Sequence, residues 1–352
     1  MDNFIKKELQ DVPKDYISDM IFMKEYRQLL VTSWDGTISL YHLSRGEEEE
    51  EEKAKDELRL LNRLRYKVPL LCCSYMIIPS RSYSDWMDLT IYAGTIHGEI
   101  VQIDFETNRI EPIASNNDAQ LGISKMIRSV KNKKLYVSSW DCLIQELDPV
   151  SNQITKKIRL EDGKKVLSMD CNDDNLIIAT TSGKIKWTKL PLADGHEGER
   201  AKGMWTEVEA GLKYQLRDIK LTNDGDGYVS SSIDGRVAVE YFNDESKKFA
   251  FRCHRMNLVD MQFVFPVNTL SFDPHNNILY TGGSDGCVSV WNLDSQKKIK
   301  QFPKFNENSV VKIVTDERML CVATSDDSFK TNAVATDALQ LQPSRIYILF
   351  KM

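Results

Sequence analysis

Hydrophobic and polar residues alternate in short runs along most of the chain, and tight turns separate the runs. The stretch "GYVSSSIDGRVAVEYF" at 227–242 shows the pattern, with an Asp-Gly pair between two alternating runs. A period of two is typical of a β-strand with one buried face. Asp-Gly between two such runs favours a hairpin, because glycine accepts the positive φ that the turn requires. The pattern therefore predicts antiparallel strands joined by tight turns.

The same phrase recurs along the whole sequence. Six copies lie at 29–43, 91–104, 135–148, 176–190, 227–242 and 279–293, and a degraded seventh lies at 320–350. The residues at the turn position are Gly36, Gly98, Cys142, Gly183, Gly235 and Gly286, spaced 41 to 62 residues apart. These intervals centre on the period of about 40–45 residues of WD repeats, lengthened by loops.

This repeat predicts an all-β fold, a seven-bladed WD-repeat β-propeller that forms one domain over residues 1–352. Each repeat supplies about four strands, and neighbouring sheets bury one another's faces. The segment "NFIKKEL" near the N-terminus is expected to be the outermost strand that closes the last blade. Length alone would favour two or three domains, but a single repeat array explains 352 residues equally well.

Charge and composition narrow the class of partner. The chain is 41% hydrophobic and 28% charged, with a formal charge of −6 that the run Glu47–Glu52 can account for by itself. The rest is near neutral, so general nucleic-acid affinity is not indicated, although a local basic patch remains compatible with it. Residues 44–57, which contain the acidic run, and residues 191–203 are predicted to be solvated loop insertions, with partner recognition as the alternative.

Targeting and redox signals are weak. The first ten residues carry charges throughout and form no secretory signal, and the longest charge-free apolar stretch, at 68–80, is shorter than the roughly 20 residues that a bilayer requires. Seven scattered cysteines without a C-x-x-C motif favour reduced thiols and a cytosolic or nuclear protein. No membrane partner is expected.

No motif indicates an enzyme. The five histidines have no metal-ligand spacing among themselves or with the cysteines. The stretch "GGSDG" at 282–286 matches the nucleophile-elbow pattern, but it occupies the frame of the hairpin turns, whereas an elbow needs a helix after the strand. No Gly-rich phosphate loop is present. We therefore expect no catalytic residue, no metal and no cofactor.

The strand "KKFAFRCHR" at 247–255 alternates apolar and basic residues. Phe249 and Phe251 are expected on one face, and Lys248, Arg252 and His254 on the other. An outer face with only positive charge is unusual for a half-buried strand. The position of this strand in its blade indicates which groups the positive face can contact.

Three arginines of the fifth repeat are expected at one end of the blade. In a WD-type blade four strands run outward from the axis, so the start of the first strand, the turn between the second and third, and the end of the fourth share one end, which we call the top end. These positions hold Arg217, Arg236 and Arg252, and unpaired arginines so placed favour a carboxylate or phosphate ligand. The alternative is that Asp218, Asp234 and Glu240 neutralise them.

Two turns place a tryptophan at the top end of other blades: "SWDG" has Trp34 and "SWDC" has Trp140. Each indole either packs against the neighbouring blade or forms part of a peptide hot spot, where tryptophan and arginine are enriched. Together with the arginines they predict a top face that binds an extended peptide with acidic or phosphorylated residues.

Several stretches resemble one family closely. "LRYKVPLLCC", "SSIDGRVAVEYF", "FAFRCHR" and "YTGGSDGCVSVWN" are similar to the Bub-type (budding uninhibited by benzimidazoles) WD-repeat proteins of the mitotic spindle checkpoint, and "PKDYISDM" and "CVATSDDSFKTN" resemble the budding-yeast form. The resemblance covers nearly the whole chain. The acidic run and the loops at 80–88 and 191–203 lie outside it.

The resemblance implies a non-enzymatic adaptor of the nucleus and of mitotic kinetochores. Such proteins bind GLEBS segments of a checkpoint kinase and its pseudokinase-like relative, and dock on phosphorylated Met-Glu-Leu-Thr repeats of a kinetochore scaffold. By motif, Arg217, Arg236 and Arg252 would meet the GLEBS glutamates and the phosphothreonine, and Trp34 would contact the bound peptides. Which arginine serves which ligand stays open. The protein is expected to be a monomer bound to a partner peptide.

Two other classes compete with this reading. "GRVAVEYF" and "CHR" also occur in the sister messenger-RNA export factor, which binds a GLEBS segment of a nucleoporin. The N- and C-terminal stretches favour the checkpoint member. An enzyme or a substrate receptor of a ubiquitin ligase is the third class, and no motif supports it.

Overall fold

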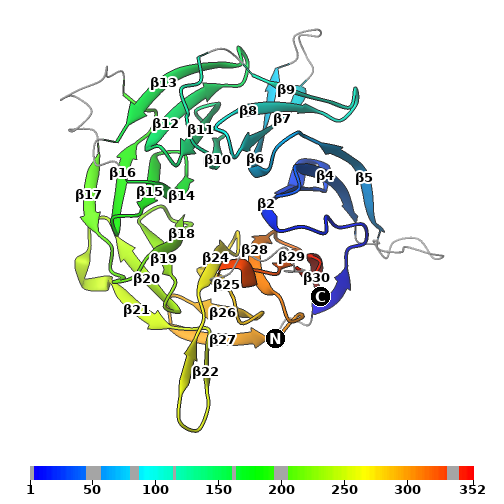
Figure 1. Cartoon of the computed structure of the whole chain (residues 1–352). Helices are drawn as coiled ribbons and strands as arrows, with labels where there is room; N and C mark the ends of the chain where they lie inside the picture. Colours follow the sequence, from blue (N-terminus) through cyan, green and yellow to red (C-terminus); the bar gives the residue numbers. More distant parts are fainter. Residues whose placement is uncertain are drawn as a thin grey trace. The chain divides into compact units, whose positions relative to one another are not determined.

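The computed structural model of the chain describes residues 4–44, 57–79, 87–113, 116–160, 164–193, 205–330 and 341–352. Within these ranges the chain is built of β-strands and three single-turn 3-10 helices, η1 (Lys24–Tyr26), η2 (Glu245–Lys247) and η3 (Ser328–Lys330). The strands form seven four-stranded antiparallel sheets, the arrangement of a seven-bladed β-propeller, with one further hairpin (Figure 1). The predicted all-β, seven-bladed fold is confirmed.

The chain divides into two compact units. The first consists of residues 1–69 and 254–352, and the second consists of residues 70–253. Each is described in turn. That residues 1–352 form a single domain stays a prediction.

The second unit contains blades 2 to 5, and each blade takes its four strands in chain order. Blade 2 consists of β6 (Leu70–Pro79), β7 (Met87–Thr95), β8 (Ile100–Asp104) and β9 (Arg109–Pro112), and blade 3 of β10 (Ile123–Ser129), β11 (Lys134–Ser139), β12 (Leu143–Asp148) and β13 (Gln153–Arg159). Blade 4 consists of β14 (Val166–Cys171), β15 (Asn175–Thr180), β16 (Lys184–Lys189) and β17 (Thr206–Glu209), and blade 5 of β18 (Leu216–Leu221), β19 (Gly227–Ser232), β20 (Arg236–Tyr241) and β21 (Phe249–Arg252).

The first unit contains blades 1, 6 and 7 and the extra hairpin. Blade 1 consists of β2 (Ile17–Met23), β3 (Gln28–Ser33), β4 (Thr37–Ser44) and β5 (Glu57–Arg65), and blade 6 of β24 (Val267–Phe272), β25 (Ile278–Gly283), β26 (Val288–Asn292) and β27 (Lys297–Phe302). Blade 7 consists of β28 (Ser309–Thr315), β29 (Met319–Ser325), β30 (Arg345–Lys351) and β1 (Phe4–Glu8). The hairpin consists of β22 (Arg255–Asn257) and β23 (Gln262–Val264). The N-terminal strand β1 pairs with β30, as the predicted closure of the last blade requires.

The turn between the second and third strands has a left-handed residue in six blades. Gly36 has φ +82°, and a Cβ there would lie 2.6 Å from the carbonyl oxygen of Tyr66, so only glycine fits. Cys142 holds the same position in blade 3 with φ +68°, which shows that the turn can accept a side chain where the space allows it. The predicted hairpin turns are confirmed.

Burial falls from the inner strands to the outer strand of a blade. Every residue of β15 is buried, whereas five of the six residues of β27 are exposed. A strand buried on both faces needs a sheet on either side, and each large apolar side chain buried there contributes roughly 1.5–3 kcal/mol. Variation in surface chemistry is therefore confined mainly to the turns and the outer strands.

The predictions on loops, cysteines, membrane segments and metal ligands compare with the structure as follows. Residues 45–56, with the acidic run, and residues 194–204 of the second predicted loop lie outside the described residues. All seven cysteines are free thiols. In the described ranges, no helix is long and apolar enough to cross a membrane, and no group of His, Cys, Asp or Glu side chains could hold a metal ion.

Candidate functional site

The top end of blade 5 brings two arginines directly opposite each other. Arg236 opens β20 and Arg252 closes β21, and the two residues are cross-strand partners in the register. The pairing continues beyond the strands, because the Cys253 N–H donates to the Gly235 carbonyl over 2.9 Å. Directly opposed side chains have Cβ atoms about 4.5–5.5 Å apart, and like charges there destabilise a sheet. The predicted juxtaposition of Arg236 and Arg252 is confirmed, and it costs stability.

One carboxylate offsets part of that charge. The Arg236 Nε atom lies 3.0 Å from Asp234 Oδ2, and Asp234 Oδ1 also accepts a hydrogen bond from the Ser232 hydroxyl. The expectation that all three arginines are unpaired is therefore wrong for Arg236. The reason is local: the turn places Asp234 two residues before Arg236 with its carboxylate toward the same strand end.

The other two candidate carboxylates are engaged elsewhere. Asp218 is buried and accepts a hydrogen bond from the Ser168 hydroxyl over 2.7 Å. Glu240 accepts from the Gly211 N–H over 3.3 Å, and burial raises the pKa of its carboxyl. Of the three carboxylates that the sequence suggested as neutralising partners, Asp234 forms an ion pair with one of the arginines.

Arg252 differs from the arginines at the same position of two other blades. The register pairs Thr37 with Arg65 in blade 1 and Leu143 with Arg159 in blade 3, as it pairs Arg236 with Arg252 in blade 5. Arg65 donates from Nε to the Asp35 carbonyl over 3.1 Å, and Arg159 donates from Nη1 to the Asp141 carbonyl over 2.7 Å. Arg252 is exposed, and no carboxylate of the described residues pairs with it.

Arg217 lies at the same end of blade 5, on the innermost strand. It falls in a β-bulge, because the register of β18 and β19 shifts between Leu216 and Ile219. The Nε atom of Arg217 is buried and has no hydrogen-bond partner in the described part of the chain. Strands are about 4.8 Å apart, so two strand spacings, roughly 10 Å, separate its backbone from that of Arg236. The three arginines share one end of one sheet.

Trp140 lies at the top end of blade 3 and is partly packed. Its ring covers Gly122, where a Cβ would lie 2.9 Å from two ring carbons, and the backbone N–H of Trp140 donates to the Gly122 carbonyl over 3.0 Å. The side chain is half-buried, and Lys165 Nζ lies 6.0 Å from the ring centre. Trp140 thus combines a packing role with a partly open face beside a cation. The sequence analysis missed Lys165, because it precedes the next blade and no motif marks it.

Trp34 occupies the equivalent turn of blade 1, in the first unit. Its backbone N–H donates to the Tyr16 carbonyl over 3.0 Å, and its half-buried side chain lines a surface pocket of about 600 Å³. The other residues that line this pocket are Asp35, Arg65, Tyr66, Lys67, Val68 and Pro69. An indole beside two cations suits an acidic peptide with an apolar side chain. The stretch "LRYKVP" was noted only for its family resemblance, and its contribution to this pocket was missed.

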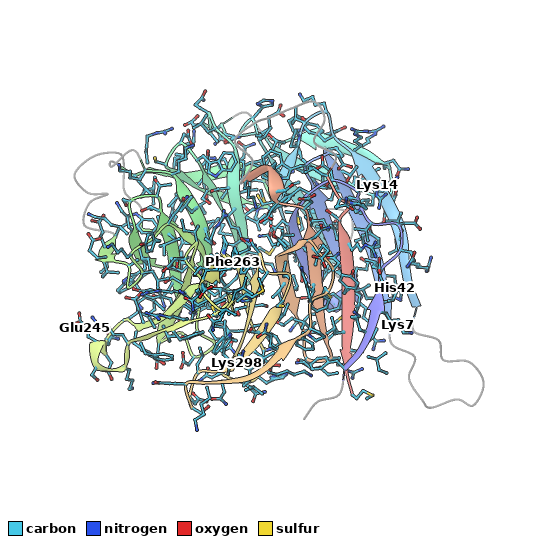
Figure 2. All side chains as sticks on the ribbon, turned by 60° about the horizontal axis from the view of Figure 1, so that its bottom comes forward. Lys7, Lys14, His42, Glu245, Phe263 and Lys298 are labelled. Atoms are coloured by element: carbon cyan, nitrogen blue, oxygen red, sulfur yellow. The ribbon has the colours of Figure 1, made fainter. Side chains whose placement is uncertain are left out.

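The hairpin β22–β23 presents the densest exposed apolar surface in the described residues of the first unit. Exposed fractions are 48% for Met256, 52% for Leu258, 100% for Val259, 58% for Met261 and 42% for Phe263, which Figure 2 labels. A two-stranded sheet of this size buries little of its own surface. The alternating pattern of 256–264 was available in the sequence, but its exposure was not.

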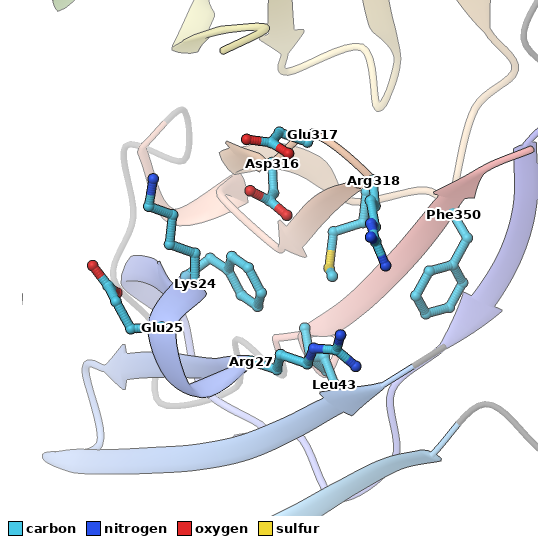
Figure 3. A pocket seen from close by; sticks show the side chains of 10 residues that line it. Lys24, Glu25, Arg27, Leu43, Asp316, Glu317, Arg318 and Phe350 are labelled. Carbon is cyan, nitrogen blue, oxygen red and sulfur yellow. The ribbon is translucent and has the colours of Figure 1, made fainter. Parts of the chain in front are cut away.

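A second pocket, of about 310 Å³, lies in the first unit at the opposite end of blades 1 and 7 (Figure 3). Phe22, Leu43, Met319 and Phe350 supply its apolar lining. The charged residues around it are mixed: Lys24, Glu25 and Arg27 come from blade 1, and Asp316, Glu317 and Arg318 come from blade 7. The pocket has no uniform charge that would indicate a class of ligand.

His254 is not part of the basic outer face that the sequence predicted. It is 4% exposed and has φ +49°, which turns the chain away from strand geometry directly after Arg252 and Cys253. Its Nδ1 lies 2.8 Å from Asp285 Oδ1 and its Nε2 lies 2.9 Å from Thr281 Oγ1. Trp291 Nε1 donates to the same threonine oxygen over 3.1 Å. His254 therefore holds the core of blade 6 together.

The stretch "GGSDG" is a hairpin turn, as the frame of the repeats indicated. β25 ends at Gly283 and β26 begins at Val288, so strand follows strand. The Ser284 hydroxyl donates to Asp327 Oδ2 over 3.0 Å and has no histidine beside it among the hydrogen bonds of the described residues. The serine has a structural role.

The sequence has clear relatives among known proteins. Residues 261–292 match the family model "WD domain, G-beta repeat". The chain is 28% identical to "Mitotic checkpoint protein BUB3.1" of Arabidopsis thaliana, over 91% of this chain and 86% of the relative. It is 28% identical to "Spindle assembly checkpoint protein bub3" of Schizosaccharomyces pombe, over 96% and 97%, and 26% identical to the "Poly(A)+ RNA export protein" of the same yeast, over 84% and 77%.

A solved structure with the same fold is "Crystal structure of RRP9 WD40 repeats", with a TM-score of 0.72 over 99% of this chain and 97% of the other, at 12% identity. At such low identity, the similarity supports a shared fold and does not indicate a shared function. The matched repeat, the seven sheets and the relatives agree. The chain is a seven-bladed WD-repeat β-propeller that is similar, over most of its length, to the Bub-type proteins of the mitotic spindle checkpoint.

Proposed function

We propose that this protein is a non-enzymatic adaptor of the spindle assembly checkpoint, which works in the nucleus and at mitotic kinetochores. Its partners would be GLEBS segments of a checkpoint kinase and its pseudokinase-like relative, and phosphorylated Met-Glu-Leu-Thr repeats of a kinetochore scaffold. The similarity to checkpoint proteins supports this role. The proposal includes no catalysis, cofactor, nucleic-acid or membrane partner in this role, and a monomer bound to a partner peptide.

The observation that carries the proposal is the pair Arg236 and Arg252. Two arginines opposite each other cost stability, and Asp234 offsets only one of them. An exposed guanidinium without a carboxylate, beside one held in place by Asp234, suits a ligand that brings its own negative charge. A phosphothreonine brings about −1.5 to −2 charges and three strong acceptors, which the guanidinium fork can grip.

The tryptophans would serve the GLEBS segments. Trp34 has an indole surface in a pocket that also presents Arg65 and Lys67, and Trp140 has Lys165 beside its ring. Such aromatic-basic surfaces fit a peptide that carries acidic and apolar residues. Arg217 has a buried Nε atom without a hydrogen-bond partner in the described residues, and after the two tryptophans it is the third residue that would contact the GLEBS segment, by binding a glutamate.

The test is a titration of phosphorylated and unmodified Met-Glu-Leu-Thr peptides by fluorescence anisotropy. The double variant Arg236→Ala/Arg252→Ala should lose most of the preference for the phosphopeptide, because charge-assisted hydrogen bonds contribute about 1.5–3 kcal/mol each. Arg252→Lys should restore it only in part, since an ammonium keeps the charge but loses the fork. Trp34→Ala should weaken the binding of a GLEBS peptide by about tenfold or more.

Arg159→Ala is the matched control, because Arg159 holds the register position of Arg252 but donates to the Asp141 carbonyl. It should leave the phosphopeptide preference unchanged. A double variant of blade 5 that still prefers the phosphopeptide tenfold would move the phosphate site away from Arg236 and Arg252, with Arg217 as the next residue to change.

The second candidate function is messenger-RNA export through a nucleoporin GLEBS segment. The similarity to a "Poly(A)+ RNA export protein" over 84% of the chain favours it. The two functions separate in cells: a fluorescent fusion should gather on unattached kinetochores of arrested cells if the protein is a checkpoint adaptor, and at nuclear pores of interphase cells if it is an export factor.

A further inference from the structure

The outer strands of blades 6 and 7 carry a lysine cluster on the first unit. β27, with the sequence "KKIKQF", contributes Lys297, Lys298 and Lys300, and β1 contributes Lys6 (Figure 2 labels Lys298). β27 hydrogen-bonds to β26 alone among the described strands, and its first five residues are exposed. We call these four lysines the outer lysine cluster.

The aromatic contacts join the two strands. Phe4 of β1 meets Phe302 of β27 edge to face, with ring centres 5.2 Å apart. Lys300 Nζ lies 4.8 Å from the Phe4 ring centre and 4.5 Å from that of Phe302. Lys6 Nζ lies 5.6 Å and 5.3 Å from the rings of Phe305 and Tyr347, which are themselves 5.2 Å apart. Lys6 and Lys300 therefore lie over connected rings, and Lys297 and Lys298 are exposed farther along the same outer strand, β27.

The cluster is left without negative charge. No carboxylate of the described residues pairs with any of its four lysines. The nearby carboxylates are already engaged, because Glu307 pairs with Lys304 and Glu8 pairs with Arg345. The outer strand of blade 3 offers a contrast: β13 also has three basic residues, but Lys157 pairs with Asp118, and Arg159 with Asp141. Lys298 does donate to Gln301 Oε1 over 2.9 Å, but this neutral partner leaves its charge unbalanced. Lysines on an outer strand also discourage edge-to-edge aggregation, but that role does not require them to lack a carboxylate.

The surroundings decide what kind of anion fits. The rings beneath the lysines offer little apolar surface to a peptide side chain, since Phe302 is 6% and Tyr347 is 4% exposed, and Lys300 and Lys6 lie over the half-buried rings of Phe4 and Phe305. β27 also has a bulge, because the register with β26 shifts between Val290 and Trp291, so Ile299 has no partner and a regular added strand would not fit. What remains is a row of point charges, which suits an anion of high and regular charge density. Duplex nucleic acid carries one charge per about 1.7 Å of its axis.

We propose that the outer lysine cluster binds the phosphate backbone of nucleic acid without reading its sequence. The cluster is separate from the arginines of blade 5, and the inference does not depend on the proposed function. The near-neutral charge of the rest of the chain argues against general nucleic-acid affinity, so binding is expected to be local and weak, in the micromolar range or above at physiological salt.

The test is fluorescence anisotropy of a fluorescein-labelled 20-base-pair DNA duplex with the full chain, between 25 and 200 mM KCl. Four phosphate contacts should give a slope of about −3 to −4 for log K against log salt. Lys297→Gln/Lys298→Gln/Lys300→Gln should weaken binding about tenfold or more at 50 mM KCl and reduce the slope by about 3. The triple change of the same lysines to arginine should keep both.

The matched control is Lys156→Gln/Lys157→Gln/Arg159→Gln on β13, which removes the same charge from another outer strand and should leave binding within twofold. Arg236→Ala/Arg252→Ala should also leave it unchanged. The proposal is overturned if the duplex shows no salt-dependent binding at 25 mM KCl, or if the blade 3 control weakens binding as much as the β27 variant. It is also overturned if a 20-residue polyglutamate peptide binds as tightly as the duplex, which would identify an acidic polypeptide as the partner.

Discussion

Blades 5 and 6 use the same turn for opposite purposes. In blade 6, Asp285 accepts from the Cys287 N–H over 3.1 Å and pairs with buried His254, and Thr281 joins that histidine to Trp291. In blade 5, Asp234 occupies the equivalent turn position but faces Arg236 at the surface. Ser230 holds the position of Thr281, and its buried hydroxyl has no partner in the described residues. One carboxylate joins a buried hydrogen-bond network, and the other pairs with an arginine at the surface.

The contrast shows that a repeated motif does not imply a repeated role. The backbone of both turns is the same, with φ +64° at Gly235 and +76° at Gly286. The difference arises from the chain segment that precedes each blade. His254, itself left-handed, precedes blade 6 and contacts Asp285 of its turn, whereas residues 210–215 before blade 5 contain no histidine. Where the histidine is lacking, the turn aspartate is available for a surface arginine.

The largest effect is expected from His254→Ala. The change removes two hydrogen bonds and leaves Asp285 and Thr281 facing a cavity, so it should lower the free energy of unfolding by about 3 kcal/mol. Denaturant unfolding measures this. Ser230→Ala in blade 5 is the matched control, and it should change stability by less than about 0.5 kcal/mol because its hydroxyl has no partner. Equal losses for the two variants would contradict the comparison.

Blade 5 is stabilised by an ion pair with blade 4, where blade 6 has a hydrogen-bond network around His254. Lys220 on β18 pairs with Asp170 of β14 over 3.1 Å, and Asp170 also accepts from the Leu221 N–H. Burial alone would lower the pKa of Lys220, but Asp170 and Asp218 outweigh it and raise that pKa, so Lys220 is protonated at neutral pH.

Lys220→Met should cost about 2 kcal/mol, because it leaves a largely buried carboxylate without its partner. The double variant Asp170→Leu/Lys220→Met should recover much of that loss in denaturant unfolding, since both charges are then gone. A double variant that loses as much as the sum of the single ones would show that the pair does not act as a unit.

A smaller effect, with a pH signature, is expected where blade 6 meets blade 7. Lys351 Nζ lies 2.5 Å from Asp273 Oδ2. Burial raises the pKa of Asp273, but the hydrogen bonds from Lys351 and from the His275 N–H outweigh it, so the pKa is lowered. A lowered folded-state pKa stabilises the protein above the unfolded value of about 3.9, and this contribution is lost as the pH falls through the folded-state value.

Lys351→Gln should therefore cost about 1 kcal/mol at pH 7, and the difference from the wild type should shrink as the pH falls below the unfolded value of about 3.9 and through the lowered folded-state pKa. Urea unfolding at pH 7 and at acidic pH gives both numbers. A difference that stays constant over this range would assign the effect of Lys351 to packing alone.

The smallest effect is expected from Arg236→Ala. The change loses a half-exposed ion pair with Asp234 but also relieves the repulsion from Arg252, so stability should change by less than about 0.5 kcal/mol. A thermal melt is sufficient. A loss above about 1.5 kcal/mol would show that Arg236 is structural, in the way His254 is, and that blade 5 does not differ from blade 6 as described.

The candidate site was predictable to the extent that it depends on strand register. A chain reversal near Asp244 places Arg236 opposite Arg252, because residues at equal distances from the reversal face each other in an antiparallel pair. The ion pair of Arg236 with Asp234 was not predictable, since it depends on the rotamers of two surface side chains. The burial of His254 was missed because its positive φ breaks the alternation on which the prediction was based.

The sequence by itself determined the all-β class, the seven repeats and the positions of the turns, because strand period and turn chemistry are local properties. Only the tertiary structure decided which polar side chains are engaged. Asp218 and Glu240 are neighbours of the arginines in sequence, yet they face Ser168 and Gly211. Arg159 and Arg252 share one register position, but only Arg159 of the two pairs with a carboxylate of the described residues. These pairings depend on which strands and loops pack beside each other, and that arrangement is not encoded within a single repeat.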